Sequence, residues 1–145
     1  MADGLPFEEA GPREAWEALS SDRKAALVDV RTAAEWSFVG VPDLSSVGGE
    51  VIRMEWQTYP SMQVDGGFAE KLDERLRAAG ADRDSPVFFL CRSGVRSAAA
   101  ATALAQLGYR HCLNVSGGFE GQRDEDGHRG TVDGWKAASL PWKQA

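Results

Sequence analysis

The sequence predicts an α/β domain with a central parallel sheet and helices on both faces. Three apolar runs of strand length, at residues 26–30, 86–90 and 111–115, alternate with stretches of helical periodicity. This alternation is typical of a parallel sheet that is covered on both sides. The run at 86–90, PVFFL, is apolar throughout, which indicates a central strand. A length of 145 residues and a hydrophobic share of 43% are sufficient for one compact domain.

The first two helices are predicted from their start and stop signals. Residues 12–20 begin with a proline and place two apolar side chains on one face. Thr32 is expected to cap the second helix, because Glu35 stands three residues later, at the capping-box position. Gly40 is expected to end that helix.

Two further helices follow from apolar spacing and composition. Residues 68–79 carry an apolar side chain at every fourth position, residues 95–107 are rich in alanine, and a glycine follows each stretch. Residues 50–54 are a weaker candidate strand. Residues 56–62 are predicted to be irregular, with room for one short helical turn.

Two segments are expected to lie outside the regular elements. Residues 1–10 predict a flexible, acidic leader without the basic and apolar regions of a signal peptide. Residues 121–133 are polar and contain glycine, so we expect a surface excursion that either is merely solvated, gates a site or meets a partner protein. Every apolar run is too short to span a bilayer. We therefore expect a cytoplasmic protein with no membrane partner.

The charge balance limits the classes of partner. The chain has 16 lysines and arginines against 22 acidic residues, which gives a formal net charge of −6. A negative surface repels phosphate backbones, so we expect no nucleic-acid partner. An anionic substrate then has to be attracted by a local basic site, and this makes a cluster of arginines informative.

The two cysteines, Cys91 and Cys112, stand in unrelated contexts and form neither a disulfide framework nor a Cys-x-x-Cys pair. Cys112 lies in a predicted strand and is expected to be a small core residue, with a resolving or second sulfur-carrying role as the alternative. His111 and His128 are isolated from other ligand types. We therefore expect no metal site and no other cofactor.

One short segment stands out as a candidate active site because it directly follows the strand at 86–90 and opens the alanine-rich helix. Ligands of open α/β sheets bind beyond the carboxyl ends of strands. The free N–H groups and dipole of a helix N-terminus favour a thiolate there and can cradle an anion. Arginine, serine and glycine add charge, hydroxyl donors and a tight turn. The segment comprises Cys91, Arg92, Ser93, Gly94, Val95, Arg96 and Ser97.

This segment resembles the active-site loop of rhodanese sulfurtransferases, whose single-domain members often read Cys-Arg-Ser-Gly-x-Arg-Ser. Residues 28–31 (VDVR) resemble the Asp-x-Arg strand end of the same family, and residues 40–42 (GVP) stand where many members have Gly-His-Ile-Pro, without the histidine. Residues 116–119 (SGGF) and 134–135 (GW) resemble the two halves of the family's closing motif, with the polar excursion inserted between them. The resemblance implies a rhodanese-like fold for residues 11–145.

The resemblance also implies an activity and assigns roles. Cys91 would carry sulfane sulfur as a persulfide, taken from a small donor such as thiosulfate and passed to cyanide, a small thiol or a protein thiol. Residues 92–97 would bind the donor, with Arg92 and Arg96 holding its sulfonate end. In sulfur-transferring members the second arginine stands five positions after the cysteine, as it does here, whereas phosphatase and arsenate-reducing relatives have one residue more.

The resemblance places Asp29 and Arg31 beside the loop. Asp29 is expected to brace the loop or its arginine, and Arg31 is expected to add positive potential for substrate binding; the alternative is a structural ion pair elsewhere. Trp56 and Tyr59 lie in a segment that could rim the pocket.

Other functional classes stay open at this point. An arsenate reductase or phosphatase on the same fold is disfavoured by the loop length. A buried structural cysteine would not explain the arginines, glycine and serines around it. A non-enzymatic interaction module often loses the cysteine, whereas Cys91 and both loop arginines are present here. A persulfide carrier dedicated to one partner protein remains an alternative.

Overall fold

The computed structural model describes residues 6–58 and 60–144 and has a five-stranded parallel sheet at its centre. The strand order is β1-β8-β7-β2-β4. Its strands are β1 (Glu8–Ala10), β2 (Ala26–Asp29), β4 (Ile52–Arg53), β7 (Val87–Leu90) and β8 (Cys112–Val115). Because β7 lies in the middle and all four of its residues are buried, the prediction of a central apolar strand is confirmed.

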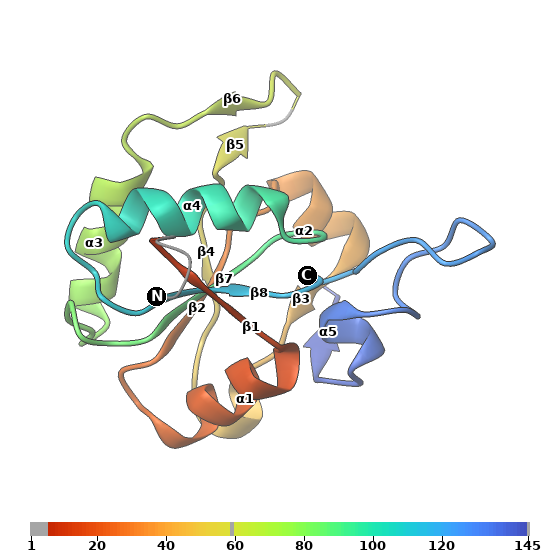
Figure 1. The fold of residues 1–145 in the computed structure, drawn as a ribbon, viewed down its shortest axis with the longest axis horizontal. Helices are drawn as coiled ribbons and strands as arrows, with labels where there is room; N and C mark the ends of the chain where they lie inside the picture. The colour runs from red at the N-terminus through yellow and green to blue at the C-terminus, as the bar shows by residue number, and fades with distance from the viewer. Residues whose placement is uncertain (1–5, 59, 145) are drawn as a thin grey trace.

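Helices cover both faces of this sheet (Figure 1). They are α1 (Pro12–Ser21), α2 (Ala33–Val39), α3 (Phe68–Ala78), α4 (Val95–Ala105) and the short α5 (Gly134–Ala137), with a 3-10 turn η1 at Ser45–Val47. Side chains of β7 alternate between the faces, as a strand requires. Phe89 packs in the core with α3 and α4, whereas Phe88 and Leu90 pack in the core with α1 and α5. The predicted α/β architecture is confirmed.

Two small antiparallel ribbons complete the fold. One joins β3 (Val41–Pro42) to β9 (Trp142–Lys143), and the other joins β5 (Gln57–Thr58) to β6 (Gln63–Val64). The ribbon of β5 and β6 projects from the domain in Figure 1. The prediction of a short helical turn at 56–62 is therefore corrected. The chain there enters a hairpin instead, in which Gln57 pairs with Val64 and Thr58 pairs with Gln63.

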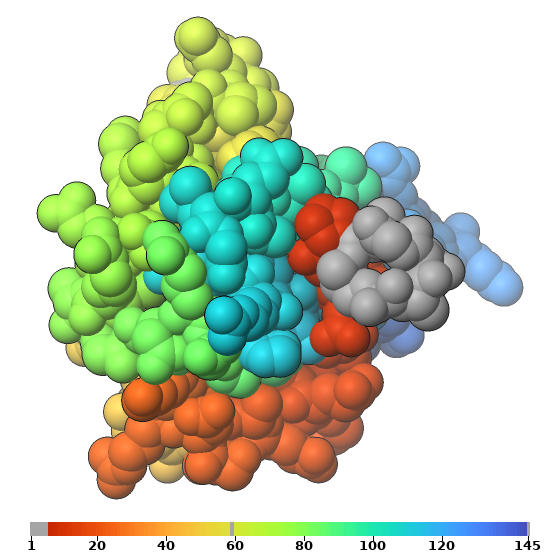
Figure 2. Space-filling view, turned by 60° about the vertical axis from the view of Figure 1, so that its left-hand side comes forward, coloured from red at the N-terminus to blue at the C-terminus, as the bar shows by residue number. Residues whose placement is uncertain are grey.

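The amino-terminal segment also differs from the prediction. Residues 8–10, assigned to a flexible leader, form β1 and pair in parallel with β8 at the edge of the sheet. Ala10 is buried, and Glu9 accepts hydrogen bonds from Asn114 and Ser116. Three residues with two glutamates carry no strand periodicity, so only the partner strand selects this structure. Figure 2 shows the red segment of β1 at the surface beside the cyan α4. Residues 1–5 of the predicted leader lie outside the described residues.

The polar stretch between 122 and 133 is a loop that extends away from the sheet (Figure 1). The carboxylate of Asp124 accepts hydrogen bonds from the backbone amides of Asp126 and His128 and from the Thr131 hydroxyl. The carboxylate of Asp133 accepts one from the Gln122 amide at 2.8 Å. Hydrogen bonds to its own aspartates thus stabilise this excursion.

Within residues 6–58 and 60–144, none of the helices has the length and apolar character to cross a membrane.

Candidate active site

The candidate loop lies where the sequence predicts, between the end of β7 at Leu90 and the start of α4 at Val95. The Val30 amide donates to the Leu90 carbonyl at 2.9 Å, so the loop begins beside the carboxyl end of β2. Gly94 is the N-cap of α4 and has φ +117°, a backbone conformation that favours glycine. The turn therefore presents the first amides of α4 toward the end of the strand.

Cys91 sits inside this turn and is only 1% exposed. The Gly94 amide donates to its Sγ at 3.1 Å, and the Ser97 hydroxyl oxygen lies 3.2 Å from the same sulfur. Ser97 is fully buried, whereas Arg92 is exposed and Val95 is 81% exposed. The loop thus gathers hydrogen-bond donors around one sulfur atom, an arrangement that can stabilise negative charge on that sulfur or on an atom bonded to it.

A second loop holds the backbone of the first. The Phe119 amide donates to the Cys91 carbonyl at 2.7 Å, and the Glu120 and Gly121 amides donate to the Arg92 carbonyl at 3.0 and 3.1 Å. Gly118 has φ +62°, and a Cβ there would collide with both of these carbonyl groups. The Gly-Gly motif therefore lets the closing segment approach the active-site loop closely enough to clamp it.

Arg96 forms a bidentate ion pair with Glu35 of α2. Its Nη1 and Nη2 lie 2.6 and 2.9 Å from the two carboxylate oxygens, and both side chains are about one-fifth exposed. Glu35 also accepts hydrogen bonds from the amide and the hydroxyl of Thr32, as the predicted capping box requires. Arg96, one of the two arginines expected to hold the donor's sulfonate, is thus already paired with a carboxylate.

The titration of Glu35 reflects this pairing. Burial by itself would raise the pKa of Glu35, but the hydrogen bonds and charge of Arg96 and the bonds from Thr32 lower it below its usual 4.5. A carboxyl group whose pKa is lowered by folding stabilises the protein above its unfolded pKa. That contribution is lost as the pH falls through the folded value.

Glu35→Gln is expected to lower the free energy of unfolding by about 1 kcal/mol at neutral pH. The loss should become progressively smaller as the pH falls below 4.5 and through the lowered pKa of Glu35. Glutamine keeps an oxygen that can accept from Thr32, so the helix cap survives and only the charge pair with Arg96 is lost. Urea denaturation at a series of pH values measures the difference. A loss of equal size at acidic and neutral pH would contradict the ion-pair explanation.

Asp29 and Arg31 form an ion pair that is wholly buried, with both side chains 0% exposed. Arg31 donates to the Asp29 carboxylate through Nε at 2.9 Å and Nη2 at 2.7 Å, and to the Gly40 carbonyl at 2.8 Å; its guanidinium lies 4.3 Å from the centre of the Phe119 ring. Asp29 therefore pairs with Arg31, and Arg31 has no exposed surface. The expected bracing of the loop by Asp29 and the expected contribution of Arg31 to substrate binding stay predictions. A buried guanidinium requires an internal carboxylate because an unpaired charge is costly inside a protein.

Two other candidates, Cys112 and Trp56, pack in or against the core. Cys112 is 2% exposed in β8, and burial raises the pKa of its thiol to about 12, in agreement with the predicted core position. Trp56 is half-buried at the border of the core and packs edge-on against Phe68, with ring centres 5.2 Å apart. Tyr59 lies outside the described residues. Among the residues that are described, no three histidine, cysteine or carboxylate side chains gather as a metal site would require.

Asn114 is a buried site residue that the sequence analysis did not single out. Its Oδ1 lies 2.5 Å from the Ser97 hydroxyl, and its Nδ2 donates to the Gly94 carbonyl at 3.1 Å and to Glu9 at 3.0 Å. The available signal was one amide side chain in an otherwise apolar strand, since such a group needs a hydrogen-bond partner when it is buried.

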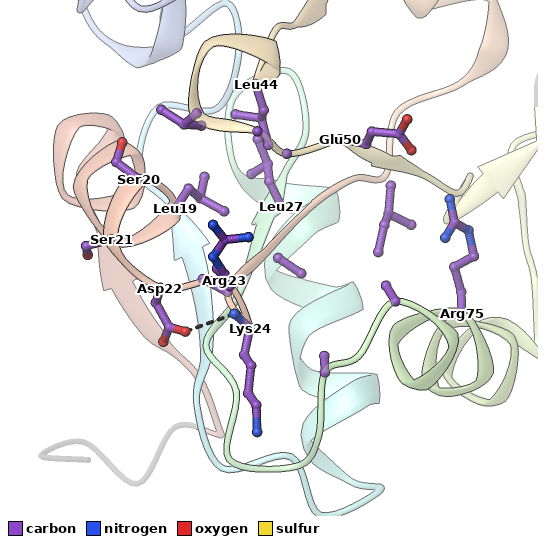
Figure 3. A pocket seen from close by; sticks show the side chains of 18 residues that line it. Leu19, Ser20, Ser21, Asp22, Arg23, Lys24, Leu27, Leu44, Glu50 and Arg75 are labelled. Atoms are coloured by element: carbon purple, nitrogen blue, oxygen red, sulfur yellow. Dashed lines mark hydrogen bonds between the residues drawn. The ribbon is translucent and has the colours of Figure 1, made fainter.

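A cavity of about 460 Å³ lies at the opposite end of β2. Leu19, Leu27 and Leu44 line it together with Arg23 and Arg75 (Figure 3). None of residues 91–97 lines it, so this cavity offers no contact with the Cys91 sulfur.

Known proteins resemble this chain over most of its length. The crystal structure of Rv0390 from M. tuberculosis matches 95% of this chain and 98% of its own, with 47% identity and a TM-score of 0.84. Uncharacterized protein RC0915 of Rickettsia conorii is 37% identical over 130 residues, which cover 90% of this chain and 92% of that protein. Thiosulfate sulfurtransferase GlpE of Actinobacillus succinogenes is 28% identical over 141 residues, which cover 97% of this chain and 95% of that protein. A model of the rhodanese-like domain matches residues 11–125. The chain therefore belongs to the family of rhodanese-like domains.

Proposed function

We propose that this protein is a sulfurtransferase that carries sulfane sulfur as a persulfide of Cys91. The observation that carries the proposal is the position of Cys91 Sγ at the opening of α4, 3.1 Å from the Gly94 amide and 3.2 Å from the Ser97 hydroxyl oxygen. The similarity to a protein named thiosulfate sulfurtransferase, over almost the full length of both chains, supports thiosulfate as the donor.

The proposed reaction has two displacement steps and no cofactor. In the first, the Cys91 thiolate attacks the outer sulfur of thiosulfate; a sulfur–sulfur bond to Sγ forms while the bond within thiosulfate breaks, and sulfite leaves with its electron pair. In the second, cyanide or a thiolate attacks the outer sulfur of the persulfide. The Cys91 thiolate then leaves, and the protein returns to its starting state.

Residues 92–97 are proposed to bind the donor. Backbone amides at the start of α4 would face the transferred sulfur, and exposed Arg92 is free to approach the sulfonate. Arg96 is partly exposed, and it can bind a sulfonate only if its ion pair with Glu35 is shared or broken.

Cys91 and Cys112 are both free thiols, consistent with the cytoplasm as the proposed compartment.

A protein thiol is a second candidate acceptor, favoured by an exposed apolar side chain within the loop. Val95, on the first turn of α4 and four residues after Cys91, is 81% exposed. An apolar side chain presented to solvent there contributes nothing to binding a small anion but can pack against a protein partner. The chain could therefore serve as a dedicated persulfide carrier.

Intact-mass spectrometry after brief incubation with thiosulfate tests the proposal. We expect the mass to rise by one sulfur atom and to return to its starting value after cyanide or a reductant is added. The Cys91→Ser variant should show no gain. An unchanged mass of the wild-type protein with thiosulfate would overturn the small-donor proposal, and assays for phosphatase and arsenate reductase activity would then follow.

A further inference from the structure

The Ser97 hydroxyl has one hydrogen but more than one neighbour that could accept it. Its Oγ lies 3.2 Å from Cys91 Sγ, 2.5 Å from Asn114 Oδ1 and 3.2 Å from the Gly94 carbonyl oxygen. The three side chains are enclosed, since Cys91, Ser97 and Asn114 are at most 4% exposed, and Gly94 is half-buried. Water therefore has little access, and the direction of this hydrogen is decided by the surrounding protein groups.

The orientation of the Asn114 amide decides that direction. Its other end lies 3.0 Å from Glu9 Oε2 and 3.1 Å from the Gly94 carbonyl oxygen. A carboxylate and a carbonyl group can only accept, so the NH₂ group of Asn114 must face both of them. The amide oxygen is then left facing Ser97, and the Ser97 hydroxyl must donate its hydrogen to Asn114.

A consequence for Cys91 follows from this single hydrogen. While Ser97 donates to Asn114, it offers only a lone pair to Cys91 Sγ, and a lone pair suits a protonated thiol. When the sulfur becomes an anion, the hydrogen must turn from Asn114 to Sγ, and the Asn114 oxygen loses its donor. Formation of the anion therefore breaks one buried hydrogen bond for each one that it makes.

We propose that Asn114, held in orientation by Glu9, is a positioning residue that sets through Ser97 how readily Cys91 ionises. It stabilises the protonated thiol at rest and releases the Ser97 hydrogen once negative charge develops on sulfur. The importance of this device for turnover rests on the proposed sulfur transfer, whereas its effect on the acidity of Cys91 does not. Other charged groups on the elements around Cys91 stay unchanged in the test below: Asp29, Arg31, Glu35, Arg92 and Arg96.

The experiment follows the rate of Cys91 alkylation by iodoacetamide against pH, with the site of modification identified by mass spectrometry. In Asn114→Ala the Ser97 hydrogen is free to serve the sulfur, so we expect the midpoint of the pH–rate curve to move to lower pH. The rate on the acidic limb should rise about fivefold, the size expected for one hydrogen bond. The plateau at high pH should stay unchanged, whereas a merely loosened loop would raise the rate at every pH.

Two further variants make the test specific to Ser97. Ser97→Ala removes the hydroxyl, so Asn114→Ala is expected to have no further effect in that background. Ser116→Ala is the matched control, because Ser116 also donates to the Glu9 carboxylate, at 3.0 Å, but does not take part in the bonds between Asn114 and Ser97. Its alkylation curve should equal that of the wild type.

Glu9→Ala is a milder variant in case Asn114→Ala does not fold, since Glu9 is exposed on edge strand β1. It should move the midpoint in the same direction by a smaller amount. The part of this shift that disappears in the Ser97→Ala background reports the hydrogen bond, and the part that persists there reports the loss of the Glu9 charge. An unmoved or raised midpoint in the folded variants, or a shift of Asn114→Ala that persists without Ser97, would overturn the proposal. Alkylation by iodoacetamide does not require a persulfide. A protein that forms no persulfide with thiosulfate could therefore still show the shift, so the test of Asn114 is independent of the test of sulfur transfer.

Discussion

Replacing Cys91 by serine is expected to abolish the transfer of sulfur from thiosulfate to cyanide, with turnover reduced at least about a thousandfold. A serine hydroxyl is a far weaker nucleophile at neutral pH and cannot hold sulfane sulfur as a persulfide does. The substitution is conservative for the loop, because an oxygen at this position can still accept the Gly94 amide that lies 3.1 Å from Sγ. The measurement is the rate of thiocyanate formation at saturating thiosulfate.

Cys112→Ser is the matched control for this prediction. Cys112 is equally enclosed, at 2% exposure, but it lies in β8 within the core and the pKa of its thiol is raised to about 12. This variant should lose stability, because a hydroxyl is placed in an apolar site, and should keep its turnover rate at a temperature where it is folded. Turnover that survives in folded Cys91→Ser and disappears in folded Cys112→Ser would assign the chemistry to the wrong cysteine.

Removal of the Asp29 carboxylate is expected to cause the largest loss of stability. In Asp29→Ala, the guanidinium of Arg31 would remain 0% exposed with the Gly40 carbonyl as its only remaining hydrogen-bond acceptor among the described residues. Its Nη1 already has no such partner within that part of the chain. An uncompensated charge of this kind costs about 3–5 kcal/mol, and urea denaturation at neutral pH measures the loss directly.

The double variant Asp29→Ala/Arg31→Met separates charge from packing. Because both charges are removed together and the methionine can still pack against Phe119, we expect it to be more stable than Asp29→Ala alone. It should also retain the Michaelis constant for thiosulfate, since Arg31 has no exposed surface. If the double variant were no more stable than Asp29→Ala, the protein would need the guanidinium for packing and not only for its charge. A large rise in the Michaelis constant would restore the predicted substrate role of Arg31.

Local sequence patterns are sufficient to predict the central strands and the position of Cys91. Residues 86–90 and 26–30 are local apolar runs, and a run of that length has few stable alternatives to a buried strand. The loop at 91–97 follows such a strand directly, so chain order alone brings Cys91 to the carboxyl end of a central strand and to a helix N-terminus. The cap formed by Thr32 and Glu35 was predictable for the same reason, because its two members are only three residues apart.

Contacts between groups that are far apart in the chain could not be predicted from local patterns. The partner of Arg96 is Glu35, 61 positions away, and the partner of Asn114 is Glu9, 105 positions away. The edge strand β1 likewise exists because β8 lies beside it. Local patterns specify which faces are buried but not which buried polar groups pair. Those pairs are selected when packing removes water and each enclosed charge or amide must find a partner within the fold. For buried Arg31 this requirement is met by the Asp29 carboxylate.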